Sequence, residues 1–262
     1  MKEKYDKIGI GYNSTRKADP FLIEKLFHHL NPKKEYKYLD IGCGTGNYTI
    51  ALHQKGLSFI GIEPSSEMLK IAKSRNSSIE WFDGKVDFIP LDDNIFDGAI
   101  ATLTIHHWKD LSIGFSELFR VLKTGATLVI FTATPKQMEG YWLRHYFPNM
   151  LEYSMLQMPK FELVEKKLNR GGFEIFKTEK YFVKPDLKDL FLYAGKHNPE
   201  LYLNEKVRQG ISSFSSLANY AEVANGLEKL KKDIASGQIS KIIESYKNND
   251  GDYLFIIAKT VR

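Results

Sequence analysis

Residues 38–48 of the sequence, YLDIGCGTGNY, decide the fold. They complete an apolar strand pattern that begins at Tyr36 and continue with three glycines on alternate positions, Gly42, Gly44 and Gly46. Glycine tolerates positive φ and has no Cβ, so a ligand can lie against the backbone of such a turn. In an open α/β sheet, ligands bind at this place, outside the carboxyl ends of the strands. The motif alone leaves a second interpretation open, a tight strand-to-helix turn that binds nothing.

Strand and helix patterns alternate on both sides of this turn. Continuous apolar strands separated by helices are typical of a parallel sheet covered on both faces, so the sequence predicts a doubly wound α/β fold. Expected strands cover 36–41, 58–63, 79–82, 96–103, 127–132, 173–183 and 253–259. Expected helices cover 47–54, a stretch from Ser65, 110–122, most of 137–158, 162–169 and several segments of 186–246.

An acidic residue stands at the end of the second expected strand. Glu63 follows the last glycine of the turn by about 17 residues, a spacing close to that of the ribose-binding acid in nucleotide-binding α/β folds. Its carboxylate can accept charge-assisted hydrogen bonds from both ribose hydroxyls. Without the glycine turn, a surface acid ahead of a helix is the alternative. With the turn, we expect ribose binding.

The glycine spacing indicates which nucleoside binds. A dinucleotide fingerprint reads G-x-G-x-x-G and places pyrophosphate at a helix N-terminus, whereas this turn reads G-x-G-x-G. Asp40 precedes the first glycine by two residues, and a carboxylate at the mouth of the crevice suits an ammonium group better than pyrophosphate. An adenosine joined to an amino acid is S-adenosylmethionine, which is therefore the expected cofactor.

At this point the chain resembles the class I S-adenosylmethionine-dependent methyltransferases, especially the small-molecule branch that includes quinone-biosynthesis enzymes. The resemblance covers about residues 36–133, through the glycine turn, the stretch GKVDFIP at 84–90, IHHW at 105–108 and ELFRVLKTG at 117–125. It departs from the family pattern at Val86, where alanine is usual, at Asp87, where glutamate is usual, and at Thr124 and Ala126. The cofactor residues that it implies are Asp40, Gly42, Cys43, Gly44, Gly46, Glu63, Pro64, Met68, Val86, Asp87, Thr102 and Leu103.

The resemblance also implies a topology, with strand order 3-2-1-4-5-7-6 and strand seven antiparallel. We expect one domain over 1–262, made of an N-terminal arm and helix (1–35), a cofactor-binding half (36–135), and a last helix with strands six and seven (161–185 and 250–262). Because the chain between strands six and seven starts and ends on the cofactor side, 136–160 and 186–249 are expected to form a helical cap over the substrate. The alternative for this insertion is a remote interaction module.

Candidate substrate and catalytic residues follow from this layout. The cap is rich in aromatic residues and methionines, which favours a small, partly apolar organic acceptor, although such stripes are more often plain core. The candidates for substrate binding are Tyr12, Arg16, Tyr141, Trp142 and Tyr146. His106 and His107, at the end of strand four beside the expected methyl group, are the candidate general bases because histidine titrates near neutral pH. A loop or packing role for both histidines is equally open.

Composition excludes several other functions. The charge is +5 without a basic block, so no nucleic-acid partner is expected. No apolar run is long enough to cross a membrane, one cysteine allows no internal disulfide, and a cytoplasmic location is expected. No cysteine–histidine spacing predicts a metal site. The alternatives to a small-molecule methyltransferase are a cofactor-binding regulatory subunit without turnover, an RNA methyltransferase, and a nicotinamide oxidoreductase.

Overall fold

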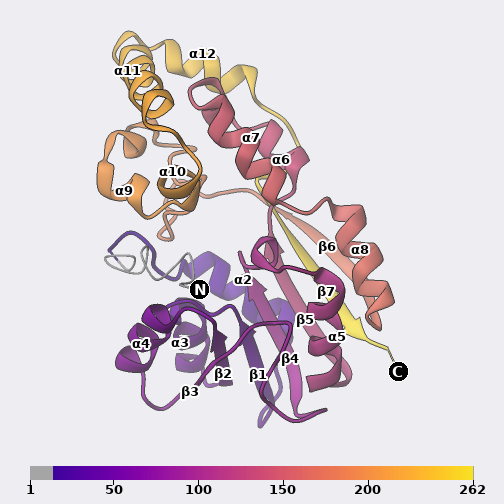
Figure 1. The fold of residues 1–262 in the computed structure, drawn as a ribbon. Helices are drawn as coiled ribbons and strands as arrows, with labels where there is room; N and C mark the ends of the chain where they lie inside the picture. The colour runs from indigo at the N-terminus through magenta and orange to yellow at the C-terminus, as the bar shows by residue number, and fades with distance from the viewer. Residues whose placement is uncertain (1–13, 262) are drawn as a thin grey trace.

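The computed structural model describes residues 14–261 and contains one seven-stranded sheet (Figure 1). The strand order is β3-β2-β1-β4-β5-β7-β6, and β7 runs antiparallel to both of its neighbours while the other paired strands are parallel. This is the order and direction that the sequence predicts. The strands are β1 (Lys37–Ile41), β2 (Ser58–Glu63), β3 (Glu80–Asp83), β4 (Phe96–Thr102), β5 (Leu122–Thr132), β6 (Phe173–Tyr181) and β7 (Tyr253–Thr260).

Two layers of helices cover the sheet because its strands are apolar on both faces. Successive residues of β1 show the alternation, since Tyr38 packs into the core on the α2 and α3 side and Leu39 packs into the core on the α5 and α8 side. A smaller cluster under α4 holds Trp81. These helices are α2 (Pro20–Leu30), α3 (Asn47–Gln54), α4 (Ser66–Arg75), α5 (Leu111–Val121) and α8 (Phe161–Arg170).

The cap lies over the carboxyl ends of the parallel strands (Figure 1). It shares one continuous core with the α2 side of the sheet, in which Phe147 and Tyr202 of the cap are fully buried together with Phe131 of β5. The cap is therefore fused to the sheet. Its helices are α6 (Pro135–Glu139), η3 (Trp142–His145), α7 (Pro148–Gln157), η4 (Pro199–Leu203), α9 (Glu205–Gln209), α10 (Ser212–Ser216), α11 (Tyr220–Ser236) and α12 (Gln238–Ser245).

The structure differs from the expectation at the start of 186–246, where the sequence predicts the first of several helical segments. Residues 182–198 form turns and irregular chain, although Leu187 and Phe191 are buried as a helical pattern would require. This segment satisfies its backbone through local turns and through contacts with distant chain. The amide of Lys188, for example, donates to Asp19 at 3.0 Å. Among the described residues, no helix is long and apolar enough to span a bilayer.

Candidate functional site

A cavity of about 450 Å³ opens between the carboxyl ends of the parallel strands and the cap. Its size lies within the roughly 300–1,000 Å³ typical of small-molecule sites. The sheet side contributes the glycine turn, the ends of β2 and β4, and the segment 84–87. The cap contributes residues of α7, of the 182–198 segment and of α10. One continuous space therefore connects the expected cofactor residues with the cap.

The glycine turn presents backbone to this cavity. Gly42 and Gly44 line it and have φ values of +73° and +56°, a conformation that residues with a Cβ rarely adopt. A Cβ on Gly42 would lie 2.1 Å from the hydroxyl oxygen of Thr104. The amide groups of Gly42 and Cys43 both donate to the carbonyl of Ile62, at 2.8 and 3.0 Å, which ties the turn to β2. Gly42 is thus packed against Thr104, whereas a Cβ on Gly44 would meet only the Met68 sulfur at 3.7 Å, so Gly44 leaves its side of the turn open to a ligand.

Gly46 does not line the cavity, so its expected direct role in cofactor binding is not supported. It caps α3 with φ +77°, and a Cβ there would lie 2.5 Å from the ring of Trp81. The third glycine is needed because an aromatic side chain packs directly on the backbone.

Asp40 also differs from the expectation, because its carboxylate does not stand at the mouth of the crevice. It is buried below the turn, is absent from the cavity lining, and accepts a hydrogen bond from the hydroxyl of Thr49 at 2.6 Å. Burial raises the pKa of this carboxyl from 3.8 to about 7; the Thr49 bond opposes the rise and the charge of Glu63 adds to it. Asp40 can act on a bound ligand through its charge rather than by contact.

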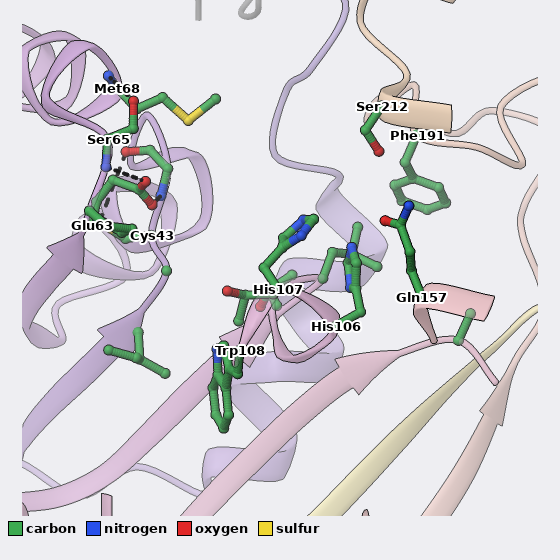
Figure 2. Close-up of a pocket in the computed structure, with 18 of the residues that line it drawn as sticks. Cys43, Glu63, Ser65, Met68, His106, His107, Trp108, Gln157, Phe191 and Ser212 are labelled. Carbon is green, nitrogen blue, oxygen red and sulfur yellow. Dashed lines mark hydrogen bonds between the residues drawn. The ribbon is translucent and has the colours of Figure 1, made fainter. Parts of the chain in front are cut away.

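Glu63 lies at the end of β2, where its carboxylate lines the cavity (Figure 2). One oxygen accepts from the amide of Gly44 and the other from the amide of Ser65, both at 2.9 Å. Ser65 in turn caps α4. A carboxylate oxygen accepts more than one hydrogen bond, so these two bonds are compatible with a role of Glu63 in binding ribose hydroxyls. Glu63 therefore also fixes the glycine turn.

The other expected cofactor residues surround the same part of the cavity. The lining includes Cys43, Pro64, Met68, Val86, Asp87, Thr102 and Leu103. Leu103 has φ +53°, an uncommon value for a residue with a branched side chain, and its amide donates to the carbonyl of Phe131 at 2.8 Å. This strained residue turns the chain away from β4 and into the short helix η2 (Ile105–His107). Backbone strain of this kind concentrates at functional sites.

His106 and His107 come from η2 and both line the cavity (Figure 2). Their rings lie 3.9 Å apart between centroids, with His106 half-buried and His107 exposed. In Figure 2, His107 lies on the side of Cys43, and His106 faces the cap side chains. Both candidate bases therefore lie between the cofactor wall and the cap.

Three aromatic candidates for substrate binding do not reach the cavity, which corrects the expectation. Tyr141, Trp142 and Tyr146 are buried in the core of the cap and are absent from the lining. Tyr141 stacks on Tyr193 with 3.8 Å between ring centroids, the Trp142 indole donates to the carbonyl of Lys196, and the Tyr146 hydroxyl donates to Asp233. Their polar atoms are satisfied inside the protein. Tyr12 lies outside the described residues.

Arg16 does line the cavity, but its guanidinium pairs with a protein carboxylate. It donates to both oxygens of Asp189, which is buried in the 182–198 segment of the cap. Asp189 also accepts from the hydroxyl of Tyr48 at 3.0 Å. This ion pair joins the N-terminal segment, α3 and the cap at one edge of the cavity.

Several lining residues had no signal in the sequence. Gln157 ends α7, Ser212 begins α10 and Asp189 lies in irregular chain, so none belongs to a recognisable motif. Phe191 and Met158 line the cavity as members of the aromatic and methionine-rich cap, which the sequence did indicate. Among residues 14–261, no group of three metal-ligating side chains is arranged to hold an ion.

The strand order, the glycine turn after β1 and the acid after β2 define a Rossmann-like fold with a nucleoside site. The family described as "Methyltransferase domain" matches residues 39–130. A demethylmenaquinone methyltransferase of Staphylococcus epidermidis is 30% identical over 196 residues, covering 66% of this chain and 79% of that protein. A crystal structure from Anabaena variabilis, described as a methyltransferase from an antibiotic biosynthesis pathway, is 33% identical with a TM-score of 0.84, covering 94% and 99% of the two chains.

The chain belongs to the class I S-adenosylmethionine-dependent methyltransferases, in the branch similar to the quinone methyltransferases, and S-adenosylmethionine is its cofactor. A more distant neighbour has the same fold, the geranyl diphosphate C-methyltransferase of Streptomyces coelicolor in complex with S-adenosylhomocysteine, at 18% identity and TM-score 0.57, covering 92% and 79% of the chains. The site of the present chain fits the cofactor, because Gly42 and Gly44 offer backbone without side chains and Glu63 places a carboxylate on the wall of the cavity.

Proposed function

We propose that the enzyme methylates a small, partly apolar organic acceptor held between η2 and the cap. The observation that carries this proposal is the single cavity, whose one wall contains Glu63 and the glycine turn and whose other wall is formed by the cap. Apolar side chains of the cap, such as Phe191 and Met158, face this space. A cavity of about 450 Å³ that must also hold the cofactor favours a small acceptor.

In the proposed site, each wall has its own task. Glu63 accepts hydrogen bonds from the ribose, and the segment holding Val86 and Asp87 lies where the adenine is expected. The cap, in our proposal residues 136–160 and 186–249 of a single domain, excludes water and orients the acceptor. Bound cofactor supplies an electrophilic methyl group on a sulfonium that leaves readily. The chain therefore has mainly to bring the acceptor atom to about 3–3.5 Å in line.

His106 and His107 are the proposed general bases. An acceptor with an acidic proton gives that proton to an imidazole nitrogen as the new bond to carbon forms, a contribution that is typically about 10²–10⁴-fold. Their place on η2, in the lining of the cavity between the cofactor wall and the cap, supports this proposal.

Calorimetry with S-adenosylhomocysteine tests the cofactor assignments. Glu63→Ala is expected to weaken binding by at least about tenfold, because a charged hydrogen-bond acceptor contributes about 1.5–3 kcal/mol. Glu67→Ala, an exposed acid in the first turn of α4, is the control and should bind normally. Unchanged affinity of Glu63→Ala would remove Glu63 from ribose binding.

A second experiment tests the bases. In an acceptor screen that measures release of S-adenosylhomocysteine, His106→Ala or His107→Ala should lower kcat by about 10²–10⁴-fold. Cofactor affinity should stay the same in both variants. Wild-type turnover in both variants would reject general base catalysis by η2.

A further inference from the structure

Within the described residues, the cap side of the cavity has no charged side chain available to an acceptor, whereas the sheet side contributes the charged lining residues Lys85, Asp87, Lys109 and Asp110. Of the cavity-lining residues that the described part of the cap contributes, only Asp189 carries a charge, and that charge is paired with Arg16. Recognition of a carboxylate or phosphate normally uses arginine or lysine, and recognition of an ammonium group needs an available acid. The cap wall offers neither to an acceptor.

Two polar side chains of this wall are aimed into the cavity. Gln157, the last residue of α7, and Ser212, the first residue of α10, face the space across from His106 and His107 (Figure 2). Within residues 14–261, neither the Gln157 amide nor the Ser212 hydroxyl makes a hydrogen bond.

Neighbouring serines of the same wall behave differently. The Ser154 hydroxyl donates to the carbonyl of Met150 and accepts from the Ser213 hydroxyl, both at 2.8 Å, so these two hydroxyl groups are used within the cap. Half-buried polar groups that the protein leaves unused keep their hydrogen-bonding capacity for water or a ligand. Gln157 and Ser212 thus differ from Ser154 and Ser213, because their polar atoms are not used to hold the cap together.

Resting on the proposed function, we infer that Gln157, assisted by Ser212, binds a neutral hydrogen-bonding group of the acceptor and selects against charged acceptors. The amide of Gln157 offers both a donor and an acceptor, so a hydroxyl, carbonyl or amide group of the ligand can pair with it. Phe191 and Gln157 line the same cavity (Figure 2), so the Phe191 ring is available to pack on the apolar part of the ligand. A charged group in contact with the cap wall at this position would lose its hydration without gaining a counter-charge from the cap.

The test is calorimetry on the full chain saturated with S-adenosylhomocysteine, using four probes that share one scaffold: cinnamyl alcohol, cinnamate, cinnamyl phosphate and cinnamylamine. The alcohol is expected to bind at least about tenfold more tightly than each charged probe. Gln157→Leu, which keeps the volume and removes the amide, should weaken binding of the alcohol by about 2–10-fold. Gln157→Lys should reverse the order between the alcohol and cinnamate.

Gln238→Glu is the matched control, since Gln238 is exposed on α12 of the cap and does not line the cavity; it should keep the wild-type order. A charged probe that binds as tightly as the alcohol, or no binding of any probe, overturns the inference.

The proposed function is tested by a different measurement, methylation in the acceptor screen. Efficient methylation of a charged acceptor would leave methyl transfer to a small molecule standing, whereas a chain that binds S-adenosylhomocysteine but methylates nothing in the acceptor screen would contradict the proposed function itself.

Discussion

Replacing Asp40 by asparagine should stabilise the cofactor-free enzyme at alkaline pH. The buried Asp40 carboxyl has its pKa raised to about 7, against 3.8 ordinarily, because burial disfavours the charged form. Between about pH 4 and pH 7, Asp40 of the folded state therefore holds a proton that it has lost in the unfolded state. The contribution of this group to the free energy of unfolding is fully present below pH 4 and is lost as pH rises through 7. The loss is about 1.4 kcal/mol per pH unit between these two values, on the order of 4 kcal/mol in all. Asparagine has no proton to lose and can still accept the hydrogen bond from Thr49.

Urea unfolding at pH 5 and pH 8 measures this effect. The free energy of unfolding of Asp40→Asn should exceed that of the wild type by more at pH 8 than at pH 5. Asp92→Asn, at an exposed position in the loop before β4, is the control and should change little at either pH. An equal difference at the two pH values, or a less stable Asp40→Asn at pH 8, would refute a neutral buried Asp40.

The same group should couple proton release to cofactor binding. If S-adenosylmethionine binds as proposed, against the cavity side of the glycine turn, its positive sulfonium and ammonium groups should favour the ionised carboxylate. Wild-type affinity should then rise between pH 6 and pH 8, and calorimetry in buffers of different ionisation enthalpy should detect proton release. Asp40→Asn should bind more weakly at pH 8, with no such pH dependence.

Three further perturbations test the packing around the site. Gly46→Ala should lower the free energy of unfolding in urea by about 1–3 kcal/mol more than Gly56→Ala does. Both glycines have positive φ, but only a Cβ on Gly46 would collide with Trp81. Equal losses in the two variants would contradict this prediction. Asp189→Ala should lower the free energy of unfolding by about 3 kcal/mol, because it removes the carboxylate that pairs with the partly buried Arg16. An unchanged free energy of unfolding would mean that this ion pair does not stabilise the fold. Burial lowers the pKa of His29 from 6.5 to about 4, so its contribution to the free energy of unfolding is complete above pH 6.5 and is lost as pH falls to 4. His29→Leu should therefore reduce the dependence of the free energy of unfolding on pH between 6.5 and 4. An unchanged dependence would exclude His29 as its cause.

The cofactor half was predictable because its geometry is local. A glycine turn directly after a buried strand fixes its own conformation, and Glu63 sits one strand away at a position that parallel pairing dictates. Asp40 was placed at the right end of the right strand, but the sequence does not show on which side of the turn a side chain lies. The structure shows its carboxylate beneath the turn, bonded to Thr49 of α3.

The acceptor wall was much less predictable, because it depends on contacts between distant segments. In the sequence, Tyr141, Tyr146 and Phe191 are alike, since all three are aromatic residues of the cap. In the structure, only Phe191 lines the cavity. Which aromatic residues become core is decided by partners such as Tyr202 and Asp233, more than 60 residues further along the chain. Gln157 and Ser212 come together for the same reason.

The antiparallel direction of β7 has a consequence for how this enzyme can change over evolution. Tyr181, at the end of β6, is paired with Tyr253, at the start of β7, so the two points where the 182–252 insertion leaves and rejoins the sheet are adjacent. The connection between these two strands can therefore vary in length without changing how they pair. A segment exchanged between relatives must also restore the core that the insertion shares with the sheet, so cap and sheet are expected to change together.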